Sequence, residues 1–427
     1  MGDIIDKFRG IAPTLRKNEV WRNVDFSRFT GEGLTLPQAT SQRPEELYCN
    51  IPDLGTLQIT LVNGYCSDGL CHTEEGVVYG SLREAAKSYA ALVKKHLNKC
   101  TNRHNPYEQF NGENFTDGAF VWVPKGVRCT KPLQILSVST GETPVFLQTR
   151  NLIVVESNAE LTLLQCDDSY GNSRSMSNNV TEVAAHAGSV VRYYKLQNMN
   201  DSSALLNQNY VSMGGDAVFN SFAITFNGGH IRNHTEVCMH EPGTTCEVNG
   251  LYLIDHEQEV DNYVFVEHGA PHCTSNELFK GIIDDSATAT FNGHVLVQEG
   301  AIKTEAYQSN RNIILTDKAN IVSKPFLEIY NDDVKCSHGS TTGQIDEQAL
   351  FYLRSRGISE RTARTLLYYA FCDEVIQKIQ LPTLRDRLSD MVKKRLHGEL
   401  TACADCALHC STPCGDSMSF HIDADKL

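Results

Sequence analysis

The sequence has no run of about 18 apolar residues, and this absence excludes a membrane-spanning helix of ordinary length. Its first ten residues, MGDIIDKFRG, carry charges from Asp3 onward and lack an apolar stretch as long as a secretion signal needs. Although Gly2 suits N-myristoylation, Asp6 stands where that motif requires Ser or Thr. We therefore expect a soluble, cytoplasmic protein that does not bind membranes.

Positive charge is also scarce, since 38 Lys and Arg face 52 Asp and Glu and give a formal net charge of −14. A surface that binds nucleic acid would have to oppose this overall field, so a nucleic-acid partner is not expected. The phosphate-binding pattern Gly-x4-Gly-Lys-Ser/Thr is missing as well. The chain is therefore not expected to bind a nucleotide itself.

Cysteine, by contrast, is plentiful. The 15 cysteines are scattered through a long chain without an export signal, which favours reduced thiols over a disulfide framework. Isolated cysteines such as Cys166 and Cys372 are interpreted as small, buried apolar side chains.

Four further cysteines crowd the C-terminal end of the sequence. They fall at spacings of two, three and three intervening residues, and four thiols at this density can enclose zinc or an iron–sulfur cluster. A thiol-rich tail without metal fits the sequence equally well, and disulfides are a third alternative. The candidate ligands are Cys403, Cys406, Cys410 and Cys414.

Four stretches of the chain differ in their hydrophobic pattern. Residues 1–119 form a mixed, partly helical N-terminal region, and residues 120–342 form a core of short apolar runs typical of strands, such as Val190–Tyr194. Residues 343–400 have a helical period, and residues 401–427 form the cysteine-rich tail. The fold class expected from this pattern is mainly β, flanked by helices.

Turn residues recur along the strand-rich core. Strand and turn units that repeat without intervening helices indicate a β-solenoid, in which each coil buries its apolar face against its neighbours. A β-sandwich is the alternative that the periodicity leaves open. The small or acidic turn residues lie about 28 residues apart at first and 14 to 18 apart later: Ala159, Ala187, Asp216 and Thr244, then Ala287, Ala301 and Ala319.

Helical periodicity marks both flanks of the core. Apolar residues recur at three- and four-residue steps from Ser81 to Lys99, and Ser81 with Glu84 forms a capping box, so one amphipathic helix is predicted there. Pro382 is expected to end a later helix, and a last helix follows from Leu384 to Leu396. Its basic residues are all expected to face outward: Arg385, Arg387, Lys393, Lys394 and Arg395.

Cys336 and His338 form the strongest candidate site. On an extended strand, residues i and i+2 share a face, so the thiolate and the imidazole can point at one ion. Such ligands suit iron–sulfur or zinc chemistry, but two ligands alone rarely hold a metal. A partner chain or sulfide would have to complete the site. A structural cysteine beside a turn-capping histidine is the alternative.

Other polar residues have simpler explanations. His230 and His234 are expected to be turn or face residues on the solenoid surface. The acidic pairs Asp284-Asp285 and Asp332-Asp333 resemble paired catalytic carboxylates, but they are more simply turn residues between coils.

Several long motifs resemble the SufB/SufD family of the SUF iron–sulfur cluster assembly system, and SufD members in particular. The resemblance covers roughly residues 120–400. It is carried by PFLEIYNDDVKCSHG at 325–339, TGQID at 342–346, LFYLRSRGI at 350–358, NGLYL at 249–253, HGAPH at 268–272 and FKGI at 279–282.

The resemblance implies a right-handed parallel β-helix with helical regions on both sides. It also implies pairing with SufB across the ends of the two β-helices, and docking of the ABC-type ATPase SufC on the C-terminal helices. His338 then matches the SufD histidine implicated in holding the nascent cluster, Cys336 matches the cysteine beside it, and SufB supplies the remaining ligands.

The function expected from this resemblance is that of a non-enzymatic scaffold for transient iron–sulfur clusters. One alternative is a structural adaptor that positions SufB and SufC without binding iron. Another is a β-helix enzyme that acts on polysaccharides. The sequence leaves open whether the isolated chain forms homodimers.

Overall fold

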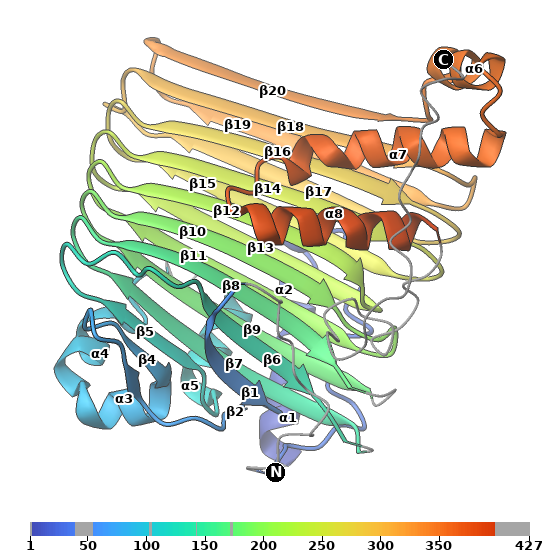
Figure 1. Cartoon of the computed structure of the whole chain (residues 1–427). Coiled ribbons are helices and arrows are strands. Elements are labelled where there is room, and N and C mark those ends of the chain that lie inside the picture. Colours follow the sequence, from blue (N-terminus) through green and yellow to red (C-terminus); the bar gives the residue numbers. More distant parts are fainter. Residues whose placement is uncertain (1, 39–53, 102–104, 142, 171–173, 398–427) are drawn as a thin grey trace.

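The computed structural model describes residues 2–38, 54–101, 105–141, 143–170 and 174–397. Two ten-stranded sheets, parallel except for their first few strands, dominate the molecule, and successive strands of the core alternate between them (Figure 1). Each coil of the chain thus adds one strand to each sheet, and the result is a β-solenoid of about seven turns. The predicted solenoid with helices at both ends of the chain is confirmed.

The two sheets are named here sheet I and sheet II. Sheet I contains, in spatial order, β2 (Tyr65–Cys66), β1 (Leu57–Val62), β6 (Leu133–Ser139), β8 (Glu160–Ser169), β10 (Val190–Asn198), β12 (Val218–Asn227), β14 (Thr245–Ile254), β16 (Thr274–Ile283), β18 (Thr304–Ile314) and β20 (Val334–Gly343). Sheet II contains β3 (Cys71–His72), β4 (Val78–Ser81), β5 (Ala119–Val123), β7 (Val145–Val155), β9 (Ser175–Ala185), β11 (Ala204–Met213), β13 (His230–Met239), β15 (Glu259–His268), β17 (Thr288–Val297) and β19 (Asn320–Ile329).

The two spacings of the turn residues have a structural cause. Ala159 and Ala187 precede β8 and β10, which are neighbours in sheet I, so their spacing measures a whole coil. Ala287 and Ala301 precede β17 and β18, which belong to opposite sheets, so their spacing measures half a coil.

The interior of the solenoid is partly polar. Apolar residues such as Val191 and Val237 are fully buried between the sheets, but amides and hydroxyls stack among them from coil to coil. Asn233 Nδ2 donates to Asn262 Oδ1 at 3.0 Å, and Tyr193 Oη donates to Gln165 Oε1 at 2.6 Å. Since buried polar groups are stable only when hydrogen-bonded, this internal network fixes the register of successive coils.

The N-terminal helices pack beside the first coils of sheet II. They are α1 (Gly2–Arg9), α2 (Ala12–Leu15), the 3-10 helix Glu19–Trp21, α3 (Leu82–Ser88), α4 (Ala90–His96) and α5 (Pro106–Asn114). The single helix predicted from Ser81 to Lys99 is therefore two. The Ser81 hydroxyl caps the first by accepting from the Glu84 N–H, and Tyr89 separates the two with a non-helical backbone (φ −123°).

The prediction that His230 and His234 lie on the surface is wrong. Both belong to β13 and are buried, at 5% and 3% exposure, under the N-terminal region. His234 lies between Trp21 and Tyr263, with its Nε2 2.6 Å from Glu236 Oε1. Aromatic residues far from this strand in sequence create that cover, so the local pattern did not reveal it.

The C-terminal helices are α6 (Glu347–Ser355), α7 (Glu360–Ile376) and α8 (Pro382–Leu396). α7 and α8 lie across the outer face of sheet I, and α6 projects beyond them (Figure 1). α7 ends at Ile376, and Pro382 does not end it but is the first residue of α8, a position where the missing N–H of proline is tolerated.

One basic residue of α8 contradicts the predicted outward stripe. Arg395 is 8% exposed. Its guanidinium donates two hydrogen bonds, of 2.8 and 2.6 Å, to Asp255 in the turn that follows β14. Its Nε also donates to the Phe226 carbonyl at 3.1 Å. Arg395 thus fastens α8 to sheet I instead of facing solvent.

Several simpler expectations are confirmed. Cys166 and Cys372 are 1% and 0% exposed. Asp284 and Asp285 form the turn between β16 and β17, and Asp332 and Asp333 lie between β19 and β20. Among the described helices, none combines the length and the apolar character that crossing a membrane requires.

Candidate functional site

The candidate ligands Cys336 and His338 lie on β20, which is the last strand of sheet I. β18 pairs with β20 on one side, and no strand of the described residues pairs with it on the other. β19 is likewise the last strand of sheet II. The coil that contains both strands, residues 320–343, is called the terminal coil here, and its outer edge exposes unpaired backbone N–H and C=O groups.

The two side chains share the inward face of β20. Cys336 pairs in register with Ala306 and packs against the small interior cluster of Val295, Val297 and Ala306. His338 follows two residues later, so it points in the same direction. Beyond Cys336 the strand is mostly exposed, and His338 is open to solvent. Thiol and imidazole therefore lie at the open mouth of the solenoid.

Ser340, the next inward residue of the strand, marks the width of this mouth. Its Oγ donates to Ser323 Oγ of β19 at 2.8 Å, so the two final strands contact each other across the interior. The mouth is therefore narrow at Ser340 and open at His338.

Burial affects the reactivity of the thiol. Desolvation raises the pKa of Cys336 above its usual range, although a hydrogen bond with the Ala306 backbone lowers it in part. The thiol is therefore protonated at neutral pH. A metal ion or cluster that binds there must displace this proton.

The site also includes a buried acid that sequence reasoning missed. Gln308, the register partner of His338 on β18, donates from Nε2 to Glu277 Oε2 at 2.7 Å. Glu277 is fully buried, and desolvation raises its pKa from 4.5 to about 8. A single carboxylate in a strand carries no sequence signal for such burial. The floor of the mouth is thus a neutral carboxylic acid at physiological pH.

We expect Glu277→Gln to flatten the dependence of stability on pH. Wild-type Glu277 loses its proton at about 4.5 when unfolded but at about 8 when folded, so its contribution to stability falls as pH rises between these values. The free energy of unfolding of the variant, relative to wild type, should increase by about 2–4 kcal/mol from pH 5 to pH 8. Denaturant titrations at both pH values measure this. Identical dependence of stability on pH in wild type and Glu277→Gln would contradict this expectation. Glu299→Gln, at an exposed position, serves as the control.

Exposed apolar side chains surround the terminal coil. Phe326 is 51% exposed and Tyr330 is 58% exposed. Isolated exposed apolar residues are ordinary, but a group of them at one end of a fold marks an interaction surface. The group consists of Ile302, Tyr307, Phe326, Ile329 and Tyr330.

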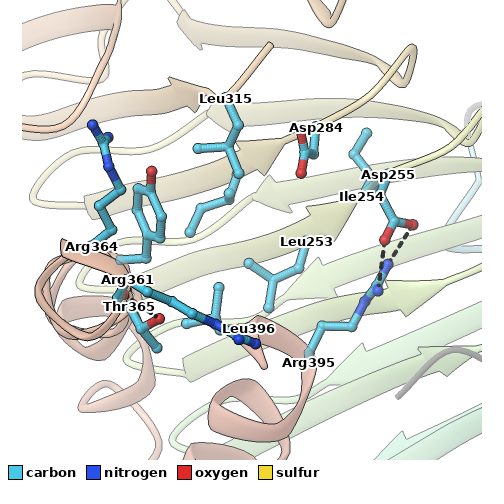
Figure 2. Close-up of a pocket in the computed structure, with 12 residues that line it drawn as sticks. Leu253, Ile254, Asp255, Asp284, Leu315, Arg361, Arg364, Thr365, Arg395 and Leu396 are labelled. Carbon is cyan, nitrogen blue, oxygen red and sulfur yellow. Dashed lines mark hydrogen bonds and ion pairs between the residues drawn. The ribbon is translucent and has the colours of Figure 1, made fainter. Parts of the chain in front are cut away.

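A second surface lies on the C-terminal helices. A groove of about 270 Å³ separates α7 and α8 from the ends of β14 and β16, and Figure 2 shows Arg361, Arg364 and Arg395 around it. Asp255, which also lines the groove, neutralises Arg395. Beyond the groove, α6 presents Phe351 and Tyr352 at 74% and 57% exposure, the former being the most exposed large apolar side chain among the described residues.

The four tail cysteines, Cys403, Cys406, Cys410 and Cys414, lie outside the described residues.

The family models match nearly the whole chain. Residues 137–371 match the model described as "SUF system FeS cluster assembly, SufBD core domain", and residues 4–135 match the SufBD protein N-terminal region. The first of these covers the solenoid from the end of β6 to β20 and continues into α7.

Individual relatives agree with these matches. The chain is 28% identical over 417 residues to an iron–sulfur cluster assembly SufBD family protein of Synechocystis, covering 92% of this chain and 91% of the relative. It is 30% identical over 279 residues to SufD of Escherichia coli, covering 65% and 66%. It is 25% identical over 328 residues to SufD of Bacillus subtilis, covering 76% and 75%. The chain therefore belongs to the SufBD family of the SUF system, as a SufD-like protein with a role in iron–sulfur cluster assembly.

Proposed function

We propose that this chain is the SufD-type half of a scaffold in which SufB pairs with the terminal coil and nascent clusters form at Cys336 and His338. The observation that supports this most is the uncapped terminal coil, which presents two inward metal ligands at an unpaired strand edge. A stable monomer normally covers such an edge with a helix, a loop or charged side chains. A partner solenoid would extend both sheets and cover the apolar side chains beside them.

Two ligands on one chain also favour a shared site. Iron in a cluster is held by four ligands per metal, and most of these are thiolates or sulfide. Cys336 and His338 supply two, so sulfide and side chains of SufB would supply the others, and the iron or cluster would be cargo that leaves after assembly. The elevated pKa of Cys336 fits transient binding, because protonation of the thiol competes with the metal.

We further propose that SufC docks on α6–α8 and acts on the site through the sheet. Lys280 of β16 contacts Glu374 of α7 at 2.5 Å and donates to the Phe371 carbonyl at 2.8 Å. Arg395 fastens α8 near the end of β14. Because β16 and β18 are the two strands before β20, movement of the helices by an ATPase would reach the terminal coil.

The scaffold is proposed to catalyse no reaction itself and to work in the cytoplasm. The acidic pairs that a polysaccharide-acting enzyme would need lie in separate turns between coils, with Asp284 and Asp333 on different levels of the solenoid. A homodimer through the same edge is the state we propose for the isolated chain, with SufB replacing the second copy. The tail cysteines are proposed to bind zinc or a cluster.

Two substitutions should separate the two docking surfaces. Phe326→Glu places a charge on the terminal coil, and Phe351→Glu places one on α6; both positions are more than half exposed, so neither should disturb folding. We expect the first to lower recovery of SufB with the tagged chain at least tenfold and to leave SufC bound. The second should do the reverse. Anaerobic purification from the native host, with quantitative mass spectrometry of the eluate, measures both.

Each variant is the control for the other. Equal loss of both partners in either variant would contradict separate surfaces. Absence of SufB and of any ABC-type ATPase from the wild-type eluate would overturn the proposed function as a whole.

A further inference from the structure

A group of three metal-ligating side chains lies far from the terminal coil, where α4 ends on sheet II. His96 is the last residue of α4, Glu156 directly follows β7, and His186 directly follows β9. Val155 pairs with Ala185 in the parallel ladder, so Glu156 and His186 occupy equivalent positions on neighbouring coils. One potential ligand atom from each residue lies within 4.8 Å of the other two.

The Nε2 atoms of the two histidines in this group lack hydrogen-bond partners among the described residues. His96 is only 6% exposed, and its Nε2 is buried without a hydrogen-bond partner among the described residues. The Nε2 of His186 is also buried and unsatisfied, since Glu156 Oε2 lies 4.0 Å away, which is too long for a hydrogen bond. An unpaired buried polar atom destabilises the folded state, so two of them beside a carboxylate require an explanation.

We propose that His96, Glu156 and His186 bind one divalent transition-metal ion, with Zn²⁺ as the ion that fits best. Two imidazole nitrogens and one carboxylate oxygen are a known zinc ligand set that leaves a fourth position for water. Glu156 and His186 keep 24% and 32% of their side chains exposed, so an ion can reach the group from solvent.

The required adjustment of the side chains is small. Bonds of 2.0–2.1 Å in a tetrahedron separate the ligand atoms by about 3.3 Å, so no separation has to shrink by more than roughly 1.5 Å. Glu156 and His186 are partly exposed side chains in turns and can make this change by rotamer adjustment. His96 is fixed by the buried end of α4. The bound ion would tie the N-terminal helices to two successive coils.

An ordinary ion pair explains the group less well. A protonated His186 attracted to Glu156 would leave His96 without a partner. In a second triad, Asp25, His230 and Glu259, the His230 Nε2 also lacks a hydrogen bond, but it lies 3.1 Å from Glu259 Oε2, an ion-pair distance, and Asp25 accepts hydrogen bonds from Ser27. The histidine of that triad thus has a carboxylate at close range, whereas His186 Nε2 lies 4.0 Å from Glu156 Oε2.

The test uses the full chain without the candidate ligands of the terminal coil and of the cysteine-rich tail. In this background Cys336 and His338 are alanine, and Cys403, Cys406, Cys410 and Cys414 are serine. After chelator treatment, calorimetric titration with Zn²⁺ should give one site per chain with a Kd in the micromolar range or below. Zn²⁺ should also raise the melting temperature. In His186→Gln and Glu156→Gln, the affinity for Zn²⁺ should fall at least 50-fold or binding should vanish. The Zn²⁺-dependent rise in melting temperature should be lost with it.

His240→Gln is the matched control. His240 follows β13 as His186 follows β9, two coils further along the same row of turns, and it is exposed. Zinc affinity equal in His186→Gln and His240→Gln would overturn the proposal, as would a background chain that binds no zinc. Anomalous diffraction at the zinc edge gives an independent readout. It should place the ion between His96, Glu156 and His186. Anomalous peaks found only at other positions would contradict the assignment.

Discussion

Replacing Arg150 with methionine is expected to lower the free energy of unfolding by about 3–5 kcal/mol. Arg150 of β7 is fully buried, and its guanidinium contacts Glu108 of α5 and Glu182 of β9, each at 2.8 Å. Without it, two carboxylates stay in the interior with no cation between them. Since α5 is fastened to the solenoid through this contact, the N-terminal helices should loosen first. Chemical denaturation followed by circular dichroism measures the change.

Two controls make the Arg150 result specific. Arg128→Met removes an exposed arginine whose side chain is 74% accessible and lies 3.4 Å from Glu160, and it should cost less than about 1 kcal/mol. Adding Glu108→Gln and Glu182→Gln to Arg150→Met removes the unpaired charges and should restore a large part of the stability. A loss below about 1 kcal/mol for Arg150→Met alone would show that the buried ion pairs do not hold this region.

The double variant Cys336→Ala, His338→Ala is expected to reduce iron–sulfur cluster assembly at least tenfold in cells that lack the wild-type protein. Both substitutions remove inward ligands at the mouth of the solenoid and leave the sheet intact, because β20 is an edge strand with little packing beyond Cys336. Loss of metal ligands, and not loss of partners, should cause the defect. The activity of a cluster-dependent enzyme in cell extracts is a suitable readout.

The two single variants and one control show how much each ligand contributes to cluster assembly. His338→Ala is expected to have the larger effect and Cys336→Ala a smaller one. Ser340→Ala changes the next inward residue on the same strand and should leave assembly close to wild type. SufB should co-purify with all four variants. Normal assembly with the double variant would support a structural adaptor that positions SufB and SufC without binding iron.

Much of the architecture was predictable because it depends on local repetition. Strand and turn units recur once per half coil, and the turn residues Ala287 and Ala301 carry that period in the sequence itself. The capped start of α3 at Ser81 and the turns at the acidic pairs also depend only on neighbouring residues. The placement of Cys336 and His338 on one face follows from strand geometry.

Two of the wrong predictions, those for Arg395 and His234, concern contacts between distant segments. Arg395 is buried because Asp255, 140 residues away in the sequence, accepts hydrogen bonds from its guanidinium. His234 is buried because Trp21 and Tyr263 lie on either side of it. The group of His96, Glu156 and His186 joins a helix end to two coils. Its one sequence signal is that Glu156 and His186 lie one coil apart at equivalent turn positions, which becomes visible only when the register is known.

The most direct test of the central claim is site-specific photo-crosslinking in the native host. A photoreactive residue at Thr341 of β20 probes the edge of the terminal coil, and one at Arg128 probes the opposite end of the solenoid. We expect a covalent adduct with SufB from position 341 and none from position 128. Adducts with SufB from position 128 alone, or adducts from position 341 only with a second copy of this chain while SufB is present, would contradict it.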